Sequence, residues 1–192
     1  MERVISSNCS QSIKSICPCR GRENIGNFMG FIQPYPGEKI LLVGDVSHYG
    51  KYLKKAGADV IIFENAQEDH MSAIVKNCNC SIVDGNIEHM PFREDLFDKI
   101  IFLNHFNSFE NEKKVLREIY RVLKIDGKLI IEEKDPKSIL MKLFMVTKKI
   151  LGFKCIFYYP HEIQKRFEQI GLAGAFKYVE KNKYIYIGKK LN

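Results

Sequence analysis

Short apolar runs alternate with longer amphipathic stretches through most of the chain, and this alternation constrains the fold more than any other feature. The runs have three or four residues each: 40–43, 60–63, 81–83, 100–103 and 129–131. Runs that are apolar almost throughout are typical of strands buried on both faces of a parallel sheet. The amphipathic stretches between them predict helices that cover those faces, so the order of elements indicates an α/β fold.

The clearest helix is predicted for residues 110–123. Its apolar side chains fall on one helical face, and its charged side chains, Arg117 and Arg121 among them, fall on the solvent face. Asp126 and Gly127 predict the turn into the next strand.

The C-terminal part has a different pattern. Residues 160–170 predict a helix that Gly171 ends, and residues 176–179 and 184–187 predict two strands joined by a short polar loop. A loop this short favours an antiparallel hairpin. The sequence therefore predicts a three-layer α/β sandwich around a Rossmann-like, doubly wound and mostly parallel sheet with a C-terminal antiparallel hairpin.

The first part of the chain lacks this alternation. Residues 1–20 are rich in Ser, Asn, Gln and Cys, and residues 33–37, with the sequence Gln-Pro-Tyr-Pro-Gly, form a turn signal that stops any helix before it. We place the boundary here. Residues 1–36 are expected to be an N-terminal arm and cover, and residues 37–192 are expected to be the folded domain.

Composition limits the class of protein. Thirty Lys and Arg residues against twenty-three Asp and Glu residues give a net charge of +7. Such a charge favours anionic ligands, nucleic acid or a membrane surface without choosing among them. No stretch approaches the roughly 18 to 20 apolar residues of a membrane-spanning helix, and the beginning of the chain lacks the apolar centre of a signal peptide. We expect a soluble, cytoplasmic protein.

The six cysteines include two C-x-C pairs, Cys17 with Cys19 and Cys78 with Cys80. Secreted disulfide frameworks belong to shorter chains with a signal sequence, and zinc sites usually have C-x2-C spacing. We therefore expect thiols that pack as small apolar side chains, and no metal site.

Two residues at predicted strand ends indicate a nucleoside site. Gly44 directly follows the run 40–43, and Glu64, twenty residues later, directly follows the run 60–63. In a doubly wound sheet, ligands lie across the carboxyl ends of the strands, where a glycine lets them approach the backbone and an acidic side chain accepts hydrogen bonds from ribose hydroxyls. The alternative interpretation is that Gly44 closes a turn and Glu64 is a solvated loop residue.

Later motifs resemble one family. They stand in order and at matching spacing: Gly-Asn-Ile-Glu-His-Met-Pro-Phe at 85–92, Phe-Asp at 97–98, Leu-Arg-Glu-Ile-Tyr-Arg-Val-Leu-Lys at 116–124 and Gly-Lys-Leu at 127–129. Together they are similar to the class I S-adenosylmethionine-dependent methyltransferases of type 11, especially the quinone-biosynthesis C-methyltransferases. The resemblance extends over about residues 37–189.

The resemblance implies S-adenosylmethionine as cofactor and assigns roles to residues. The turn at 44–47 would face the methionine part, Glu64 would hold the ribose, and Asn86 and Ile87 would meet the adenine, with Asp84 as a substitute for Asn86. The full expected cofactor-binding set is Gly44, Asp45, Val46, Ser47, Glu64, Asn65, Asp84, Asn86, Ile87, Leu103 and Asn104.

The first motif departs from the family pattern, because Val46 and His48 stand where glycines are usual. This leaves three functional hypotheses open. The first is a methyltransferase that acts on a small or apolar acceptor. The second is a methyltransferase-like binding or regulatory protein with weak or lost cofactor binding. The third is an RNA methyltransferase, which the positive charge favours but no RNA-binding motif supports.

The acceptor side is expected to follow the run 100–103. His105, the candidate catalytic residue, stands there and with Asn104 could orient an acceptor or remove its proton. Tyr35, Tyr158 and Tyr159 are further candidates to line the acceptor side, although aromatic packing is the commoner role of such side chains. Residues 137–160 are a candidate substrate lid, because 138–151 has a very wide apolar face. The same face could instead rest on a membrane surface or lie under the N-terminal arm.

Overall fold

The computed structural model describes residues 28–44, 49–65, 80–104, 106, 109, 111–138, 141, 142, 146, 150, 158–180 and 182–192. The chain divides into two compact units, Met1–Gln33 and Pro34–Asn192. In the first unit, residues 28–32 are helical, and the Gln33 N–H donates to the carbonyl of Met29 at 2.9 Å. The second unit contains the sheet.

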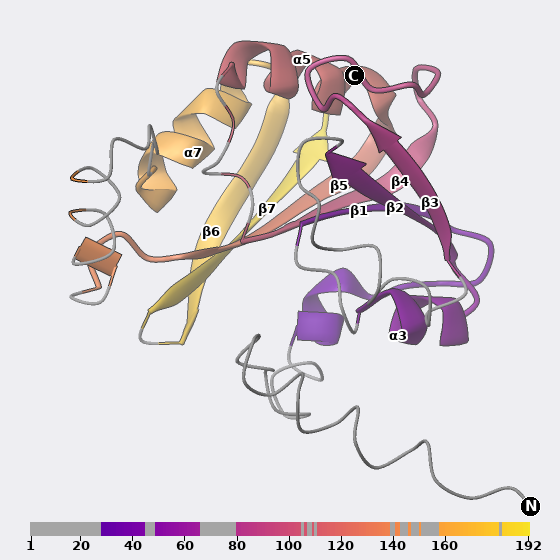
Figure 1. Ribbon diagram of the computed structural model, residues 1–192, viewed down its shortest axis with the longest axis horizontal. Coiled ribbons are helices and arrows are strands. Elements are labelled where there is room, and N and C mark those ends of the chain that lie inside the picture. The colour runs from indigo at the N-terminus through magenta and orange to yellow at the C-terminus, as the bar shows by residue number, and fades with distance from the viewer. Residues whose placement is uncertain are drawn as a thin grey trace, which may run out of the picture. The chain divides into compact units, whose positions relative to one another are not determined.

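The described strands of the second unit form one seven-stranded mixed sheet (Figure 1). Their bounds are β1 Lys39–Gly44, β2 Asp59–Asn65, β3 Ser81–Gly85, β4 Phe97–Leu103, β5 Leu123–Lys134, β6 Leu172–Glu180 and β7 Lys183–Lys190. The order across the sheet is β3-β2-β1-β4-β5-β7-β6. Strands β1 to β5 pair in parallel, and β7 pairs antiparallel with both β5 and β6. The predicted Rossmann-like sheet with a C-terminal antiparallel hairpin is confirmed.

Helices cover both faces of the sheet, which makes the unit three-layered. Helix α3 (Tyr49–Lys55) lies on one side, whereas α5 (Glu112–Val122) and α7 (Pro160–Glu168) lie on the other (Figure 1). The core on the α5 side joins strand residues to the apolar face of α5, whose buried members are Val115, Leu116, Ile119 and Val122. The same core receives Ile163 and Phe167 of α7, so both helices are anchored by burial of apolar surface.

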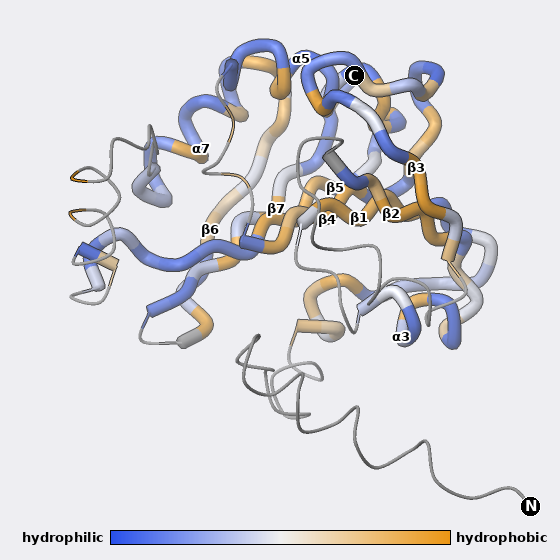
Figure 2. Tube along the Cα trace, in the orientation of Figure 1, coloured by the Kyte–Doolittle hydropathy of each residue, from blue (hydrophilic) through white to orange (hydrophobic). Residues whose placement is uncertain are grey.

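The central strands are buried on both faces, as their apolar runs predict. In β1, Leu41 and Val43 belong to the core on the α5 side, and Ile40 and Leu42 point to the opposite face. All four are 2% exposed or less. Figure 2 shows the hydrophobic colour concentrated in β1, β2 and β4, in the middle of the sheet.

The ends of α5 differ slightly from the prediction. Asn111 caps the helix, since its side-chain oxygen accepts from the Lys114 N–H at 3.4 Å, so the first helical residue is Glu112. At the other end, the chain passes directly into β5 at Leu123. The turn predicted at Asp126 and Gly127 therefore lies within the bounds of β5, where Asp126 has a φ of +64°.

A buried ion pair lies at the amino edge, the side of the sheet where β1 to β5 begin. Lys99 pairs with Glu38, and the two side chains are 5% and 0% exposed. The Tyr35 ring lies 5.0 Å from the Lys99 ammonium, and the Tyr35 N–H donates to Glu38 at 3.2 Å. Tyr35 thus belongs to this cluster, and the suggestion that it lines the acceptor side is wrong.

Lys190, at the end of β7, is buried against the C-terminal end of α5. Its ammonium donates to the carbonyls of Tyr120 and Leu123 and to the carboxylate of Asp95, each at 2.8 Å. A lysine at a helix C-terminus satisfies carbonyls that have no partner within the helix. A lysine of β7 therefore satisfies main-chain carbonyls at the end of α5, 67 and 70 residues earlier in the chain.

Candidate functional site

Five parallel strands bring their last residues together at the carboxyl edge, the side of the sheet where β1 to β5 end. Gly44 of β1 is in register with Leu103 of β4, and Leu103 is in register with Glu132 of β5. Glu64 of β2 is in register with Asp84 of β3. Residues predicted from separate parts of the sequence thus form one row across the edge, because strand register aligns them.

Glu64 lies in this row as a half-buried carboxylate. Burial raises its pKa, and the negative charge of Asp84 on the neighbouring strand raises it further. Its Oε1 is buried and has no hydrogen-bond partner among the described residues. The interpretation of Glu64 as a fully solvated loop residue is therefore wrong.

Backbone conformation at two strand ends is unusual. Gly44 has a φ of +95°, which glycine adopts without strain, at the end of β1. Asn104, directly after β4, has a φ of +52°, and its N–H donates to the Glu132 carbonyl at 2.8 Å. The Asn104 side-chain oxygen is buried and has no hydrogen-bond partner in the described part of the chain. Such a residue, held in a strained conformation with an open acceptor, is typical of a ligand site.

The segment after β4 is fixed by β5. The buried Glu133 carboxylate accepts from the Phe106 N–H at 2.6 Å. Phe106 packs edge-to-face against Phe102 and Phe109 and close to Tyr158. The part of the edge that follows β4 is therefore bordered by an aromatic cluster, and the Glu133 carboxylate holds its main chain.

Tyr158 connects this cluster to the starts of α5 and α7. Its hydroxyl donates to Glu112 at 2.8 Å, and Arg166 both pairs with Glu112 and lies over the Tyr158 ring. Burial, together with the Glu112 carboxylate, raises the pKa of Tyr158 to about 12. Tyr158 is thus a neutral hydrogen-bond donor at neutral pH, held by packing.

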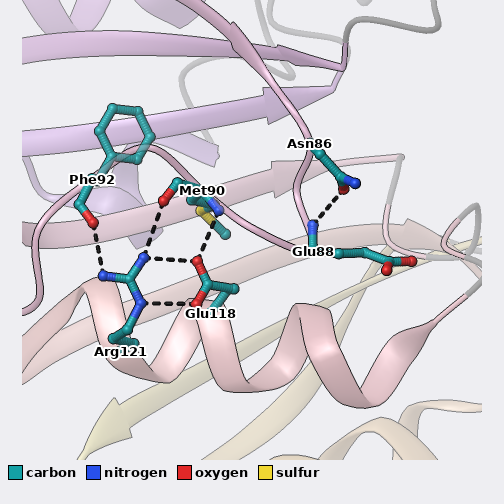
Figure 3. Close-up of polar contacts among 6 residues, drawn as sticks. All are labelled: Asn86, Glu88, Met90, Phe92, Glu118 and Arg121. Atoms are coloured by element: carbon teal, nitrogen blue, oxygen red, sulfur yellow. Dashed lines mark hydrogen bonds and ion pairs between the residues drawn. The ribbon is translucent and has the colours of Figure 1, made fainter.

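The turn after β3 presents Asn86 at the adjoining part of the edge (Figure 3). Asn86 Oδ1 accepts from the Glu88 N–H at 2.8 Å, and the Asn86 carbonyl accepts from the His89 N–H at 2.9 Å. Asn86 is exposed, whereas the Ile87 side chain is 4% exposed and belongs to the core. The side chain of Asn86 and the main chain of the turn therefore face outward.

Two residues of α5 hold the rest of this turn, and neither was predicted to have a role in the site. Arg121 donates to the carbonyls of Met90 and Phe92, and Glu118 accepts from the Met90 N–H (Figure 3). Arg121 was predicted to lie on the solvent face, and its side chain is 35% exposed, but its guanidinium donates to this turn. The sequence contained one signal for this contact, namely the joint presence of the motifs at 85–92 and 116–124. The structure brings these two motifs into contact.

Several predicted residues lie outside the described part of the chain. These are Asp45, Val46, Ser47, His48, His105 and the side chain of Asn65. Most of the candidate lid is also outside it, Leu143 and Phe144 included. The structure therefore brings together Gly44, Glu64, Asp84, Asn86, Leu103 and Asn104 at one edge, with the Ile87 side chain turned into the core.

The described residues contain no group of three or more His, Cys, Asp or Glu side chains arranged to hold a metal ion. Of the cysteines, Cys80 is described and is half-buried just before β3. Among the described helices, none is long and apolar enough to cross a membrane.

Residues 44–131, from the end of β1 to the middle of β5, match the family model of a methyltransferase domain, Methyltransf_11. The chain contains a class I methyltransferase domain. This domain family is S-adenosylmethionine-dependent, and its matched segment includes the strand ends Gly44, Glu64, Asp84 and Leu103, whereas Glu132 of β5 directly follows it. The predicted family resemblance is confirmed.

The methyltransferase domain has a distant relative among quinone-biosynthesis enzymes. The ubiquinone/menaquinone biosynthesis C-methyltransferase UbiE of Wigglesworthia glossinidia brevipalpis is 37% identical over 81 residues, which are 41% of this chain and 30% of that protein. The chain thus matches less than a third of that relative's length.

Solved structures share the fold of the methyltransferase domain. One comes from a complex between the Haloferax volcanii Trm112 methyltransferase activator and a candidate methyltransferase, with a TM-score of 0.74, 13% identity and coverage of 97% of this chain and 96% of that one. Another is Haemonchus contortus phosphoethanolamine N-methyltransferase 2, solved with S-adenosyl-L-methionine. Its TM-score is 0.70 at 11% identity, over 90% of this chain and 53% of that one. Identities this low establish the fold.

Proposed function

We propose that the chain binds S-adenosylmethionine across the carboxyl edge and transfers its methyl group to a small or apolar acceptor. The family match and the strand order support the cofactor class. The observation that carries the proposal is the environment of Glu64, whose buried Oε1 has no hydrogen-bond partner among the described residues. It stands at the strand end where the family resemblance places the ribose.

A ribose fits this environment. A buried carboxylate oxygen without a donor is costly, and the raised pKa of Glu64 reflects that cost. The two neighbouring hydroxyls of a ribose are donors that could satisfy both carboxylate oxygens with charge-assisted hydrogen bonds. Ligand binding would then stabilise the ionised carboxylate.

The other residues divide by the part of the cofactor that they would contact. The turn at 44–47 would face the methionine part, since the positive φ of Gly44 leaves the backbone open there. Asp84, Asn86 and the backbone of Ile87 would border the adenine. Asn86 Oδ1 already accepts one hydrogen bond and retains a second lone pair for an amino group. The remaining members of the proposed cofactor set are Asn65, Leu103 and Asn104.

The acceptor would lie beyond Asn104. When bound, the sulfonium supplies an electrophilic methyl group, so the chain has to position the acceptor and exclude water. The open Asn104 oxygen could accept a hydrogen bond from the acceptor, and His105 is the candidate to remove its proton. Residues 137–160 remain the candidate lid. Val146 and Ile150, two described residues of that segment, are 54% and 78% exposed, as an apolar acceptor or surface would require.

Calorimetric titration with S-adenosylhomocysteine, the demethylated product, tests cofactor binding. Loss of charge-assisted hydrogen bonds in Glu64→Ala should weaken binding by about tenfold or more. The matched control is Asp59→Ala, because Asp59 begins the same strand, is 47% exposed and forms long ion pairs of 3.8 and 3.9 Å with Lys39 and Lys54. Equal affinities for parent and Glu64→Ala would remove Glu64 from the site, and no binding by the parent would refute the proposal.

Activity on an acceptor is a separate test. Radiolabelled S-adenosylmethionine would be offered with quinones, phenols, lipids and RNA, and methylated product would be measured for each class. Transfer to a small or apolar acceptor is expected. Methyl transfer to RNA that decreases steeply with added salt would identify RNA, instead of a small or apolar molecule, as the acceptor. Tight cofactor binding without transfer to any class would favour the binding or regulatory alternative.

A further inference from the structure

The segment between β3 and β4 is held in two different ways. Its first part, Asn86 to His89, closes on itself through hydrogen bonds to the oxygens of Asn86. Its second part, Met90 to Phe92, has main-chain hydrogen bonds with side chains of α5, a helix about thirty residues further along the chain. The position of the outward-facing turn therefore depends on α5.

Arg121 and Glu118 make this connection as a unit. Arg121 Nη1 donates to the Phe92 carbonyl at 2.7 Å, and Nη2 donates to the Met90 carbonyl at 3.1 Å. Nε and Nη2 also donate to the two oxygens of Glu118 at 2.8 and 2.7 Å. Four of the five guanidinium N–H groups are therefore used, two on the helix and two on the turn.

The Glu118 carboxylate also binds the main chain of the turn. Glu118 Oε2 accepts from the Met90 N–H at 2.8 Å, so both the N–H and the carbonyl of Met90 are bound (Figure 3). The hydrogen bonds from Arg121, together with the Met90 N–H, lower the pKa of Glu118, which keeps it ionised. A bidentate pair of this kind fixes direction as well as distance.

Packing leaves the turn little freedom to shift. The Phe92 ring lies edge-to-face with Phe63 of β2, at 5.8 Å between centroids, and with Phe97 of β4, at 5.0 Å. At the start of the turn, a Cβ on Gly85 would meet the Phe63 ring at 3.1 Å. The turn is thus seated on β2, the strand that carries Glu64.

We infer that Glu118 and Arg121 are positioning residues that set the adenine-facing turn and thereby the selectivity of the site for adenine. The inference rests on the proposed function, because it takes Asn86 to border the adenine. A ligand group that donates to a fixed acceptor gains affinity only when that acceptor is held in place. Displacing the turn should therefore weaken recognition of the 6-amino group more than recognition of the ribose.

The test compares two ligands by calorimetry. S-adenosylhomocysteine carries the 6-amino group, and S-inosylhomocysteine has a keto oxygen in its place. The parent should prefer the adenosyl ligand, because an acceptor facing a keto oxygen is left unpaired. In Arg121→Lys, which cannot form the bidentate pair, affinity for the adenosyl ligand should fall by about tenfold, while affinity for the inosyl ligand changes by less than about threefold.

Two further variants separate positioning from general stability. Glu118→Gln retains an oxygen for the Met90 N–H, so most of the preference for adenine should return relative to Glu118→Ala. Arg117→Lys is the matched control, because Arg117 is exposed on the same helix, and it should change neither affinity. Melting temperatures of all variants show whether each one is folded.

The outcomes are distinct. A selective loss of adenosyl affinity, with rescue by Glu118→Gln, supports the inference. Equal loss for both ligands, or a lower melting temperature with unchanged selectivity, overturns it and leaves the pair structural. A parent that binds both ligands equally also overturns it. A parent that binds neither ligand refutes the proposed function itself.

Discussion

Replacing Glu133 by Ala should release the segment that follows β4. The Glu133 carboxylate is 3% exposed and accepts from the buried Phe106 N–H at 2.6 Å. Its removal leaves that N–H without its acceptor in a water-poor environment, which costs about 1 to 3 kcal/mol. Since the same segment begins with Asn104, already held at a φ of +52°, we expect the strand end to relax.

Hydrogen exchange and urea unfolding measure this effect directly. In Glu133→Ala, the Phe106 amide should exchange faster than in the parent by more than the loss of global stability explains. Glu133→Gln should restore much of the protection, because its amide oxygen still accepts from the N–H.

Asp135→Ala provides the matched control. Asp135 is also buried and accepts from a backbone N–H, that of Lys137 at 2.9 Å, but it holds a turn after β5. That variant should lose stability without selective exchange at Phe106. If the Phe106 amide exchanged equally in the parent and in both Glu133 variants, the carboxylate would not be what holds this segment.

Four other outcomes are expected. Lys99→Met should lower the free energy of unfolding, measured with a chemical denaturant, by about 3 to 5 kcal/mol, because it leaves the buried Glu38 without its ion-pair partner. Adding Glu38→Leu to Lys99→Met should recover most of that loss. If the effects of the two substitutions were additive, the pair would not be coupled. Affinity for S-adenosylhomocysteine should fall as the pH falls through the raised pKa of Glu64, at higher pH than for an ordinary glutamate, and Glu64→Gln should abolish this dependence. Since a carboxylate with a raised pKa binds more protons in the folded state, it lowers stability as the pH rises, so Glu64→Gln should melt above the parent at neutral pH. Gly171→Ala should destabilise by about 1 kcal/mol or more in thermal unfolding, because φ is +89° there and a Cβ would approach the Tyr120 ring at 3.2 Å.

The sequence predicted the sheet well because burial on two faces leaves a strong pattern. The run 40–43 has no polar residue, and its strand lies between two others with both faces covered. Element ends were harder to predict. Glu132 and Glu133 continue β5 beyond its apolar run although their charges favour a loop. Both side chains are buried, and the Glu133 carboxylate accepts from the Phe106 N–H, a partner that sequence distance hides.

The position of Glu64 at the carboxyl edge could be predicted from its spacing after Gly44, because both residues end strands of one parallel sheet. Arg121 could not be found in this way, because helical periodicity places it among solvated charges and its partners are main-chain atoms of Met90 and Phe92. Main-chain partners leave no signature in the identity of the residues that provide them.

Lys190, at the end of β7, also affects when the ligand site can form during synthesis of the chain. Arg121 is placed between Tyr120 and Leu123, the two residues whose carbonyls Lys190 binds. A growing chain that has emerged only as far as residue 189 contains all the strand ends of the carboxyl edge. It still lacks the Lys190 ammonium, which binds the carbonyls at the end of α5. The turn at residues 86–92 is then supported by a helix whose last turn, next to Arg121, is still frayed. We therefore expect the chain to bind ligand only after β7 has taken its place between β5 and β6. A ribosome-bound intermediate in which most of the sheet has formed would not yet bind the cofactor.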